Sequence, residues 1–304
     1  MERATGRVRW AAPVAPDSNK YFFHGDPLIT SEVVVVGADP GTGGVHAFDR
    51  ATGRQRWKYA AGKGVYGAIA GLGQLAYAIR GESELLALEI GSGSVRWSFP
   101  VDVWGWMGPA AAAGRVFVGS RDGSLYALSA ETGRVEWRTN LGASISTSVT
   151  ATPAGVFVGT GNGTMFRIDA ERGTVLASIK VDEKLKPRSD PIVTTDALLV
   201  LLTDEGDDRR ALVSVDLTLA KVRWRQTAGK PWSTSRVFVS GDAAIVGTSA
   251  GDVVAYCTTD GAMSWSQHVT GSVRAVGGWE NTLYVGTTDG DLYAVSVMRA
   301  CPVP

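Results

Sequence analysis

A tryptophan that recurs about every 40 residues is the feature that most constrains how this chain can fold. It ends phrases such as RATGRQRW at 50–57 and ETGRVEW at 131–137, and the spacing between successive phrases is 40 to 47 residues. One slot carries alanine instead. The seven positions are Trp10, Trp57, Trp97, Trp137, Ala177, Trp224 and Trp265. Repeats of this length are typical of β-propeller blades, each of which is a sheet of four strands.

The residues inside one repeat read as strands separated by tight turns. RVFVGS at 115–120, SLYALSA at 124–130 and RVEWRT at 134–139 are short runs rich in β-branched and aromatic residues. The turns between them contain Asp-Gly and Thr-Gly, and glycine supplies the positive φ angles that tight hairpins need. We call the four strands of a repeat A to D. The sequence predicts an all-β chain, with residues 1–304 forming one seven-bladed β-propeller of four-stranded antiparallel blades.

The last repeat ends after three strand signals, and this predicts how the ring closes. Residues 7–13, RVRWAAP, resemble a D strand that has no strand ahead of it. We expect them to form the outer strand of the seventh blade, beside residues 291–298. Closure of this kind removes open sheet edges.

Charge and cysteine content exclude several classes of function. Lys plus Arg and Asp plus Glu each total 30, so no net field attracts nucleic acid or an anionic membrane. Cys257 and Cys301 have no metal-ligand spacing and are too few for a disulfide framework, which predicts two free thiols. The first residues lack the apolar core of a signal peptide, and no apolar run is long enough to span a bilayer. These features predict a cytoplasmic, non-inserted protein, unless the chain is a domain of a longer one.

Two segments match a known repeat signature closely. AFDRATGRQRW at 47–57 and ALSAETGRVEW at 127–137 follow the pattern Ala-x-Asp-x-x-Thr-Gly-x-x-x-Trp, the second with Ser in place of Asp. The repeats therefore resemble the PQQ-like, or quinoprotein-dehydrogenase-like, β-propeller family over essentially the whole chain. The resemblance implies that the recurring tryptophans pack between adjacent blades and are structural.

The resemblance brings in three classes of protein with different functions. Quinoprotein dehydrogenases hold PQQ with a vicinal cysteine pair, a calcium ion and a catalytic Asp, whereas Cys257 and Cys301 are far apart in this sequence. The outer-membrane assembly lipoprotein is a scaffold with a signal peptide and a lipidated cysteine. Propellers attached to bacterial Ser/Thr kinases act as sensors or binding domains. The third class is the favoured resemblance, and it implies no enzyme activity, no cofactor and no metal.

A search for catalytic groups gives no candidate. His24, His46 and His268 lie in different repeats without a nucleophile or ligand at a recognisable spacing, and His46 is expected to pack within a strand. The loop at 38–44 lacks the Lys-Ser/Thr of a phosphate loop, and the acidic stretch at 204–210 lacks the offsets of a calcium loop.

Aromatic and basic residues cluster in the D–A connections, which link the D strand of one repeat to the A strand of the next. In propellers these connections emerge on the same face as the B–C turns. The candidate binding residues are His24, Tyr66, Trp104, Trp106, Arg188, Trp232 and Arg274. Large aromatics near guanidinium groups suit a protein or a small-molecule ligand, and the alternative is that these side chains plug the channel. We expect a monomeric sensor or scaffold. A purely structural scaffold and a PQQ-dependent dehydrogenase are the rival hypotheses.

Overall fold

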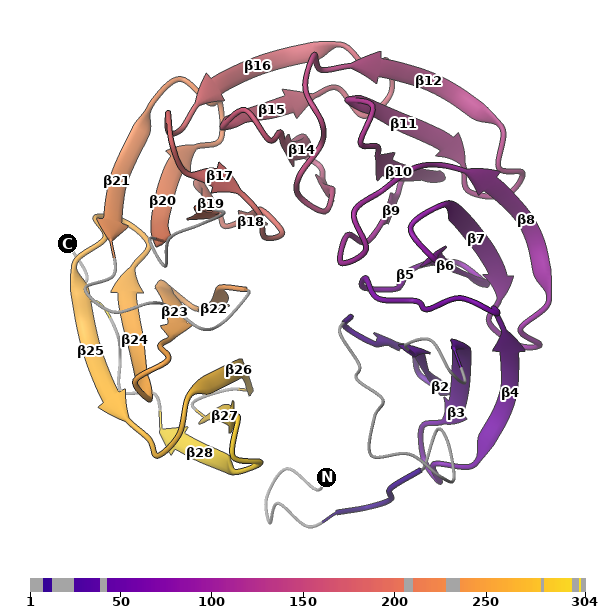
Figure 1. Ribbon diagram of the computed structural model, residues 1–304, viewed down its shortest axis with the longest axis horizontal. Coiled ribbons are helices and arrows are strands. Elements are labelled where there is room, and N and C mark those ends of the chain that lie inside the picture. The colour runs from indigo at the N-terminus through magenta and orange to yellow at the C-terminus, as the bar shows by residue number, and fades with distance from the viewer. Residues whose placement is uncertain are drawn as a thin grey trace. The chain divides into compact units, whose positions relative to one another are not determined.

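A computed structural model describes most of the chain as strands and turns (Figure 1). It describes residues 8–12, 25–38, 43–204, 210–227, 236–279, 282–296 and 301. Within these ranges no helix is present, and hence none with the length and apolarity needed to cross a membrane. The predicted all-β class is confirmed. Of the predicted binding residues, His24 and Trp232 lie outside the described ranges, as do most of the 38–44 and 204–210 loops.

Contacts divide the chain into two compact units. Unit 1 comprises Met1–Val158 with Asp169–Thr174, and unit 2 comprises Gly159–Ile168 with Val175–Pro304. The prediction of one domain over 1–304 therefore stays a prediction. Unit 1 contains three complete four-stranded antiparallel sheets, each in sequence order. The first contains β1 (Leu28–Ile29), β2 (Val33–Ala38), β3 (Gly44–Asp49) and β4 (Gln55–Ala60), and the second contains β5 (Ala70–Leu72), β6 (Leu75–Arg80), β7 (Glu84–Glu89) and β8 (Val95–Pro100). The third contains β9 (Ala110–Ala112), β10 (Arg115–Gly119), β11 (Ser124–Ser129) and β12 (Val135–Asn140).

The remaining strands follow the same sequential order. The fourth sheet contains β13 (Thr150–Thr152), β14 (Gly155–Gly159), β15 (Thr164–Ile168) and β16 (Val175–Lys180). In the fifth, β17 (Lys186–Pro187) and β18 (Ile192–Val193) both pair with β19 (Ala197–Thr203), followed by β20 (Arg210–Asp216) and β21 (Val222–Thr227). The sixth contains β22 (Phe238–Ser240), β23 (Ala243–Gly247), β24 (Asp252–Cys257) and β25 (Met263–His268), and the seventh β26 (Val273–Trp279), β27 (Thr282–Thr287) and β28 (Leu292–Ser296).

The two central strands of each complete sheet in unit 1 carry most of its core. In unit 1, Tyr77 and Leu85 of the second sheet pack in one buried cluster with Val116 and Leu128 of the third sheet. Continuous apolar runs are expected for strands that are covered on both faces. The D strand β12, in contrast, alternates between exposed and half-buried residues. The sheets are therefore packed face to face within the unit, with each D strand at an edge.

The repeated tryptophans hold neighbouring sheets together by one recurring contact. The indole Nε1–H donates to a backbone carbonyl of the next repeat, at 2.7 Å for Trp57, 2.9 Å for Trp97, 3.1 Å for Trp137 and 2.8 Å for Trp224. The acceptors are Ile90, Ala130, Ala170 and Thr258. Each indole also covers the glycine three residues after its acceptor. We call this arrangement the docking contact.

The glycines of the docking contact cannot be replaced without strain. Gly93, Gly133, Gly173 and Gly261 all have φ between +70° and +76°, and a Cβ on any of them would lie 2.5 to 2.7 Å from an atom of the facing indole. Both the backbone conformation and the close ring therefore require a residue without a side chain. The prediction that the recurring tryptophans are structural is confirmed for these positions.

The predicted closing strand is not seen in the described residues. Residues 8–12 lie in no strand, and the seventh sheet has three strands where the others have at least four. Trp10 nevertheless makes the docking contact, since its Nε1–H donates to the Arg50 carbonyl at 3.0 Å and its ring faces Gly53. The indole of Trp265 has no acceptor in the described part of the chain. Closure of the ring by residues 7–13 stays a prediction.

The slot occupied by Ala177 shows how a repeat without the tryptophan is built. Its next turn, DLTLAK at 216–221, contains no glycine. Leu219 adopts φ +58° there and is buried, while the Asp216 carboxylate accepts hydrogen bonds from backbone N–H groups of the same turn. The tryptophan and the glycine are therefore absent together from one docking position.

The prediction of two free thiols is wrong. Cys257, at the end of β24, and Cys301 form a disulfide with a Cα–Cα distance of 5.6 Å. Cys301 packs against the buried cluster shared by the sixth and seventh sheets. The sequence could not show this pairing, because 44 residues separate the two cysteines and only the fold brings them together.

Candidate functional site

The D–A connections and the B–C turns meet along one edge of the sheets, as predicted. In unit 1, Val103 N–H donates to the Glu82 carbonyl at 2.9 Å, and Arg121 N–H donates to the Asp102 carbonyl at 2.8 Å. In unit 2, Thr288 N–H donates to the Ser272 carbonyl in the same way. Each bond joins a B–C turn to a D–A connection. The backbone thus places residues from two repeats side by side at this edge.

Three side chains of unit 1 form a stack at this edge. The rings of Trp104 and Trp106 are stacked with centroids 5.9 Å apart and planes 18° apart. The guanidinium carbon of Arg121 lies 4.4 Å from the Trp104 ring centroid, which is a cation–π contact. We call Arg121, Trp104 and Trp106 the indole ladder. Trp104 is half-buried, while the Trp106 side chain is 50% exposed, and the ladder therefore presents Trp106 to solvent.

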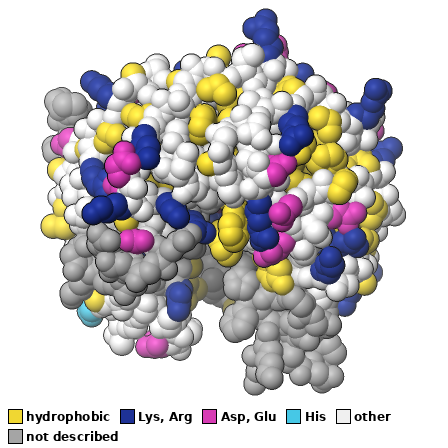
Figure 2. Space-filling view, turned by 45° about the horizontal axis from the view of Figure 1, so that its top comes forward, with side chains coloured by type: hydrophobic (Ala, Val, Ile, Leu, Met, Phe, Trp, Pro, Cys, Tyr) yellow, Lys and Arg dark blue, Asp and Glu magenta, His cyan; other side chains and the backbone are white. Residues whose placement is uncertain are grey.

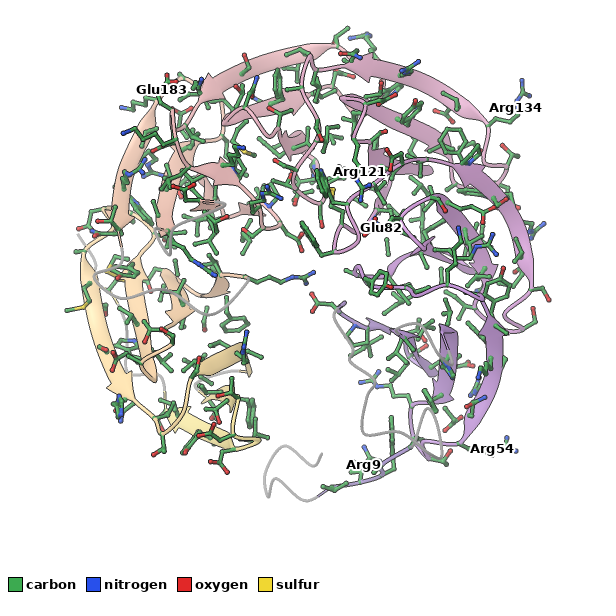
Figure 3. All side chains as sticks on the ribbon, viewed as in Figure 1. Arg9, Arg54, Glu82, Arg121, Arg134 and Glu183 are labelled. Atoms are coloured by element: carbon green, nitrogen blue, oxygen red, sulfur yellow. A yellow bond between two sulfur atoms is a disulfide. The ribbon has the colours of Figure 1, made fainter. Side chains whose placement is uncertain are left out.

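Two carboxylates fix the arginine of the ladder. Arg121 forms ion pairs with Glu82 at 2.6 Å and with Asp102 at 3.4 Å. Figure 3 shows Arg121 and Glu82 pointing toward one another from neighbouring B–C turns. The Trp104 Nε1–H donates to the Ser144 hydroxyl at 3.3 Å, which holds the second member of the ladder. Contacts within the chain thus hold both Arg121 and Trp104 in place.

The turn that carries Arg121 is shaped by Asp122 and Gly123. The Asp122 carboxylate accepts a hydrogen bond from Ser124 N–H at 2.8 Å, and Gly123 has φ +85°. Burial raises the pKa of Asp122, but hydrogen bonds from Ser124 and Ser120 and the charge of Arg138 outweigh burial and lower the pKa overall. The ionised carboxylate therefore stabilises the tight Arg-Asp-Gly turn that carries Arg121 over the Trp104 ring.

Of the other predicted binding residues, Tyr66, Arg188 and Arg274 lie in the described part of the chain. Tyr66 is half-buried in the connection between β4 and β5. Arg188 is half-buried in unit 2, where its backbone N–H faces the Leu201 carbonyl at 3.4 Å, and Arg274 is exposed on β26. A binding role for each of the seven predicted residues stays a prediction.

Sequence reasoning missed Glu82, Asp102 and Arg121. The signal was available, since RDG at 121–123 and GES at 81–83 are B–C turns and such turns share a face with the D–A connections. The charged residues that hold the aromatics come from the B–C turns as well as from the D–A connections.

Charged side chains of both signs are interspersed on the surface. The face in Figure 2 shows lysines and arginines next to aspartates and glutamates. This agrees with the equal totals of 30 basic and 30 acidic residues. Equal totals of this kind give the chain no net charge that would attract a charged partner over a long range.

The described part of the chain offers neither the vicinal cysteine pair nor the cluster of metal ligands expected at PQQ and its calcium ion. Cys257 and Cys301 bond to each other across 44 residues, so they supply no vicinal pair. The described ranges contain no group of three or more His, Cys, Asp or Glu side chains placed to hold a metal ion. His46 is buried and stacks on Phe48, as expected for a packing residue, and the exposed His268 pairs with Asp252 at 3.0 Å.

Comparison with solved structures finds the same fold in proteins of different activity. The crystal structure of BamB from Moraxella catarrhalis matches with a TM-score of 0.70 at 17% identity, covering 91% of this chain and 87% of that one. A europium-containing methanol dehydrogenase matches with a TM-score of 0.63 at 12% identity, covering 88% and 72% of the two chains. The quinohemoprotein alcohol dehydrogenase ADHIIG from Pseudomonas putida HK5 matches with a TM-score of 0.63 at 13% identity, covering 85% and 61%.

A comparison with curated proteins found no significant match. The family model described as outer membrane protein assembly factor BamB matches residues 1–103, 101–227 and 208–299. These segments span nearly the whole chain and agree with the repeat signature read from the sequence. The chain therefore belongs to the BamB-like family of PQQ-repeat β-propellers.

Proposed function

We propose that this chain is a non-catalytic scaffold that binds a protein partner through the indole ladder. The observation that carries the proposal is the exposure of Trp106, a large side chain that is half exposed. Trp106 stacks on Trp104, and the ladder's Arg121 is held by an ion pair with Glu82. Exposed aromatics on a rigid support are typical binding hot spots, and tryptophan is enriched among them. Within the described residues the ladder occurs once, whereas the docking contact recurs and is accounted for by the fold.

The family supports a scaffold rather than an enzyme. The matching model is that of an assembly factor, and the BamB crystal structure shares the fold over most of both chains. The dehydrogenases share the fold too, but the cysteines of this chain are bonded to each other and are not available as a vicinal pair at a cofactor. We favour the scaffold over the expected kinase-associated sensor because the family model names an assembly factor.

The disulfide bears on where such a scaffold works. Disulfides form and persist in oxidising compartments and are rare in the cytosol. In place of the cytoplasmic location expected from the first residues, we propose that the chain functions where Cys257 and Cys301 stay oxidised. Lysing cells directly into denaturant that contains a maleimide, followed by mass measurement, tests this, because unfolding exposes the buried Cys257 to the reagent. An unmodified chain supports the proposal, and two added maleimides overturn it.

Site-specific photo-crosslinking tests the partner surface. Trp106 must stay in place during this test, so the photo-reactive amino acid replaces Lys63, an exposed residue whose Nζ bonds the Ser83 hydroxyl beside Glu82. It should yield a discrete crosslinked product in the cells that make the protein. The same amino acid at Arg134, an exposed residue of the turn between β11 and β12, is the control. The purified partner should then bind the wild type at least tenfold more tightly than Trp106→Ala. Equal products at both positions, or equal affinities, contradict the proposal.

Thermal unfolding separates the scaffold from the dehydrogenase. Ligands that bind the native state raise the midpoint of unfolding by mass action. We expect PQQ plus Ca²⁺ to leave the midpoint unchanged. An increase that needs both PQQ and Ca²⁺ would overturn the non-catalytic assignment.

A further inference from the structure

The docking contact shows which structural element the recurring indoles of this chain bind. In each docking contact the indole face covers a glycine with positive φ, and Nε1–H donates to the carbonyl three residues earlier. Trp97, for example, donates to Ala130 and covers Gly133. The recognised element is therefore a turn whose flat surface lacks a side chain and whose carbonyl points outward.

Trp106 has the same indole side chain as the docking tryptophans, but much of its ring is exposed to solvent. One side of its ring stacks on Trp104, and half of the side chain is exposed. Its Nε1–H has no acceptor among the described residues, whereas Trp104 donates to Ser144. Trp106 thus offers an open apolar surface together with a donor that finds no acceptor in the part of the chain that the structure describes.

We propose that Trp106 makes the docking contact between molecules, by covering a glycine-containing turn of the partner protein and donating to the carbonyl three residues before that glycine. This inference rests on the proposed function and names the element that is recognised. An exposed N–H gains most from an acceptor that arrives together with a surface that excludes water.

The charges beside the ladder favour a neutral turn over a charged ligand. Arg121 is held by Glu82 and Asp102, and Lys63 Nζ bonds the Ser83 hydroxyl at 3.3 Å. These groups comprise two positive and two negative charges. Because they balance, no local excess selects an anion or a cation at Trp106.

A cyclic peptide provides the probe. It contains Ser-Ala-Glu-Thr-Gly-Arg, the sequence of residues 129–134, which is the turn that Trp97 covers within this chain. The matched control peptide has alanine in place of the glycine. Binding is followed by the ¹H–¹⁵N signal of the Trp106 indole, which is assigned as the signal missing from Trp106→Phe. We expect a saturable shift with the glycine peptide and at least tenfold weaker binding of the alanine peptide.

Two variants decide whether the indole acts as proposed. Trp106→Phe keeps an aromatic surface but removes the donor and should weaken the glycine peptide about fivefold, followed by signals of neighbouring residues. Trp106→Ala should abolish binding. Equal binding of both peptides, or full binding to Trp106→Phe, overturns the inference. If crosslinking at position 63 gives a partner that the glycine peptide does not displace, the proposed function stands and this inference fails.

Discussion

Tryptophan occupies two contrasting environments in this molecule. Trp57, Trp97, Trp137 and Trp224 recur in the repeat, donate to a backbone carbonyl and face a turn glycine. Trp104 and Trp106 lie outside the repeat and stack on each other at an edge where Trp106 meets solvent. The same side chain thus joins sheets in one region and offers a surface in the other. Recurrence marks the structural role, and departure from the repeat marks the candidate site.

The largest effect should follow loss of a docking tryptophan. Trp137→Ala removes the hydrogen bond to Ala170 and the ring that covers Gly173. We expect it to lower the free energy of unfolding by about 3 to 5 kcal/mol, measured by urea denaturation. A loss below about 1 kcal/mol, the scale of an ordinary surface substitution, would mean that the docking contact does not stabilise the sheets.

The glycine side of the docking contact should be nearly as sensitive. In Gly133→Ala the new Cβ would lie 2.6 Å from the Trp97 ring at φ +70°. We expect a loss of about 2 to 4 kcal/mol from strained backbone and overpacking. Gly114→Ala is the control, since Gly114 has φ +78° and an added Cβ would meet nothing within 4 Å, so only the backbone cost of about 1 kcal/mol applies. Equal losses of unfolding free energy in the two variants would mean that the contact with the Trp97 ring contributes nothing to the effect.

A buried tyrosine gives the docking contact a pH dependence. The Tyr77 hydroxyl donates to the Ala130 carbonyl at 3.1 Å, beside the Trp97 bond, and burial, followed by the charge of Glu131, raises the pKa of Tyr77 to about 12. Because the folded pKa exceeds the unfolded value near 10, this contribution is complete below pH 10 and is lost as the pH rises toward 12. The difference amounts to about 2 to 3 kcal/mol. Urea unfolding at pH 9 and pH 11.5 should show a steeper loss for the wild type than for Tyr77→Phe, and parallel losses would contradict the assignment.

The smallest stability effects should occur in the indole ladder. Trp106→Ala should change the free energy of unfolding by less than about 0.5 kcal/mol, because the side chain is half exposed and makes no hydrogen bond to the described residues. Trp104→Ala should cost about 1 to 2 kcal/mol, since it also loses the Ser144 bond and the Arg121 contact. Losses equal to that of Trp137→Ala would favour a plug over a binding surface.

The sequence was sufficient for the repeat and its docking tryptophans because both depend on local patterns. The spacing near 40 residues and the Thr-Gly turns predicted the sheets. The same spacing aligned the connections between neighbouring repeats. Trp10 shows the limit of such alignment. Its docking contact was predictable from the phrase that it ends, but the described residues 8–12 around it form no strand.

The ladder and the disulfide depend on contacts between distant residues. Arg121 pairs with Glu82 over 39 residues, and Cys257 pairs with Cys301 over 44. Glu82 and Arg121 lie in equivalent B–C turns of successive repeats, but the repeat does not show which side chains of those turns pair. Cys257 and Cys301 belong to no recurring pattern. Trp104 and Trp106 were found because aromatic residues at loop positions stand out, whereas the carboxylates that hold their arginine resembled ordinary surface charges.

The disulfide also turns the end of the chain into a covalent ring. β25, β26, β27 and β28 lie between Cys257 and Cys301. These two residues are therefore joined both by the peptide chain and by the disulfide. A protease that cuts once within 258–300 leaves every fragment attached. The nicked protein keeps its intact mass, increased by one water, until a reductant is added, and a terminal sheet that would otherwise be lost by a single cleavage is retained.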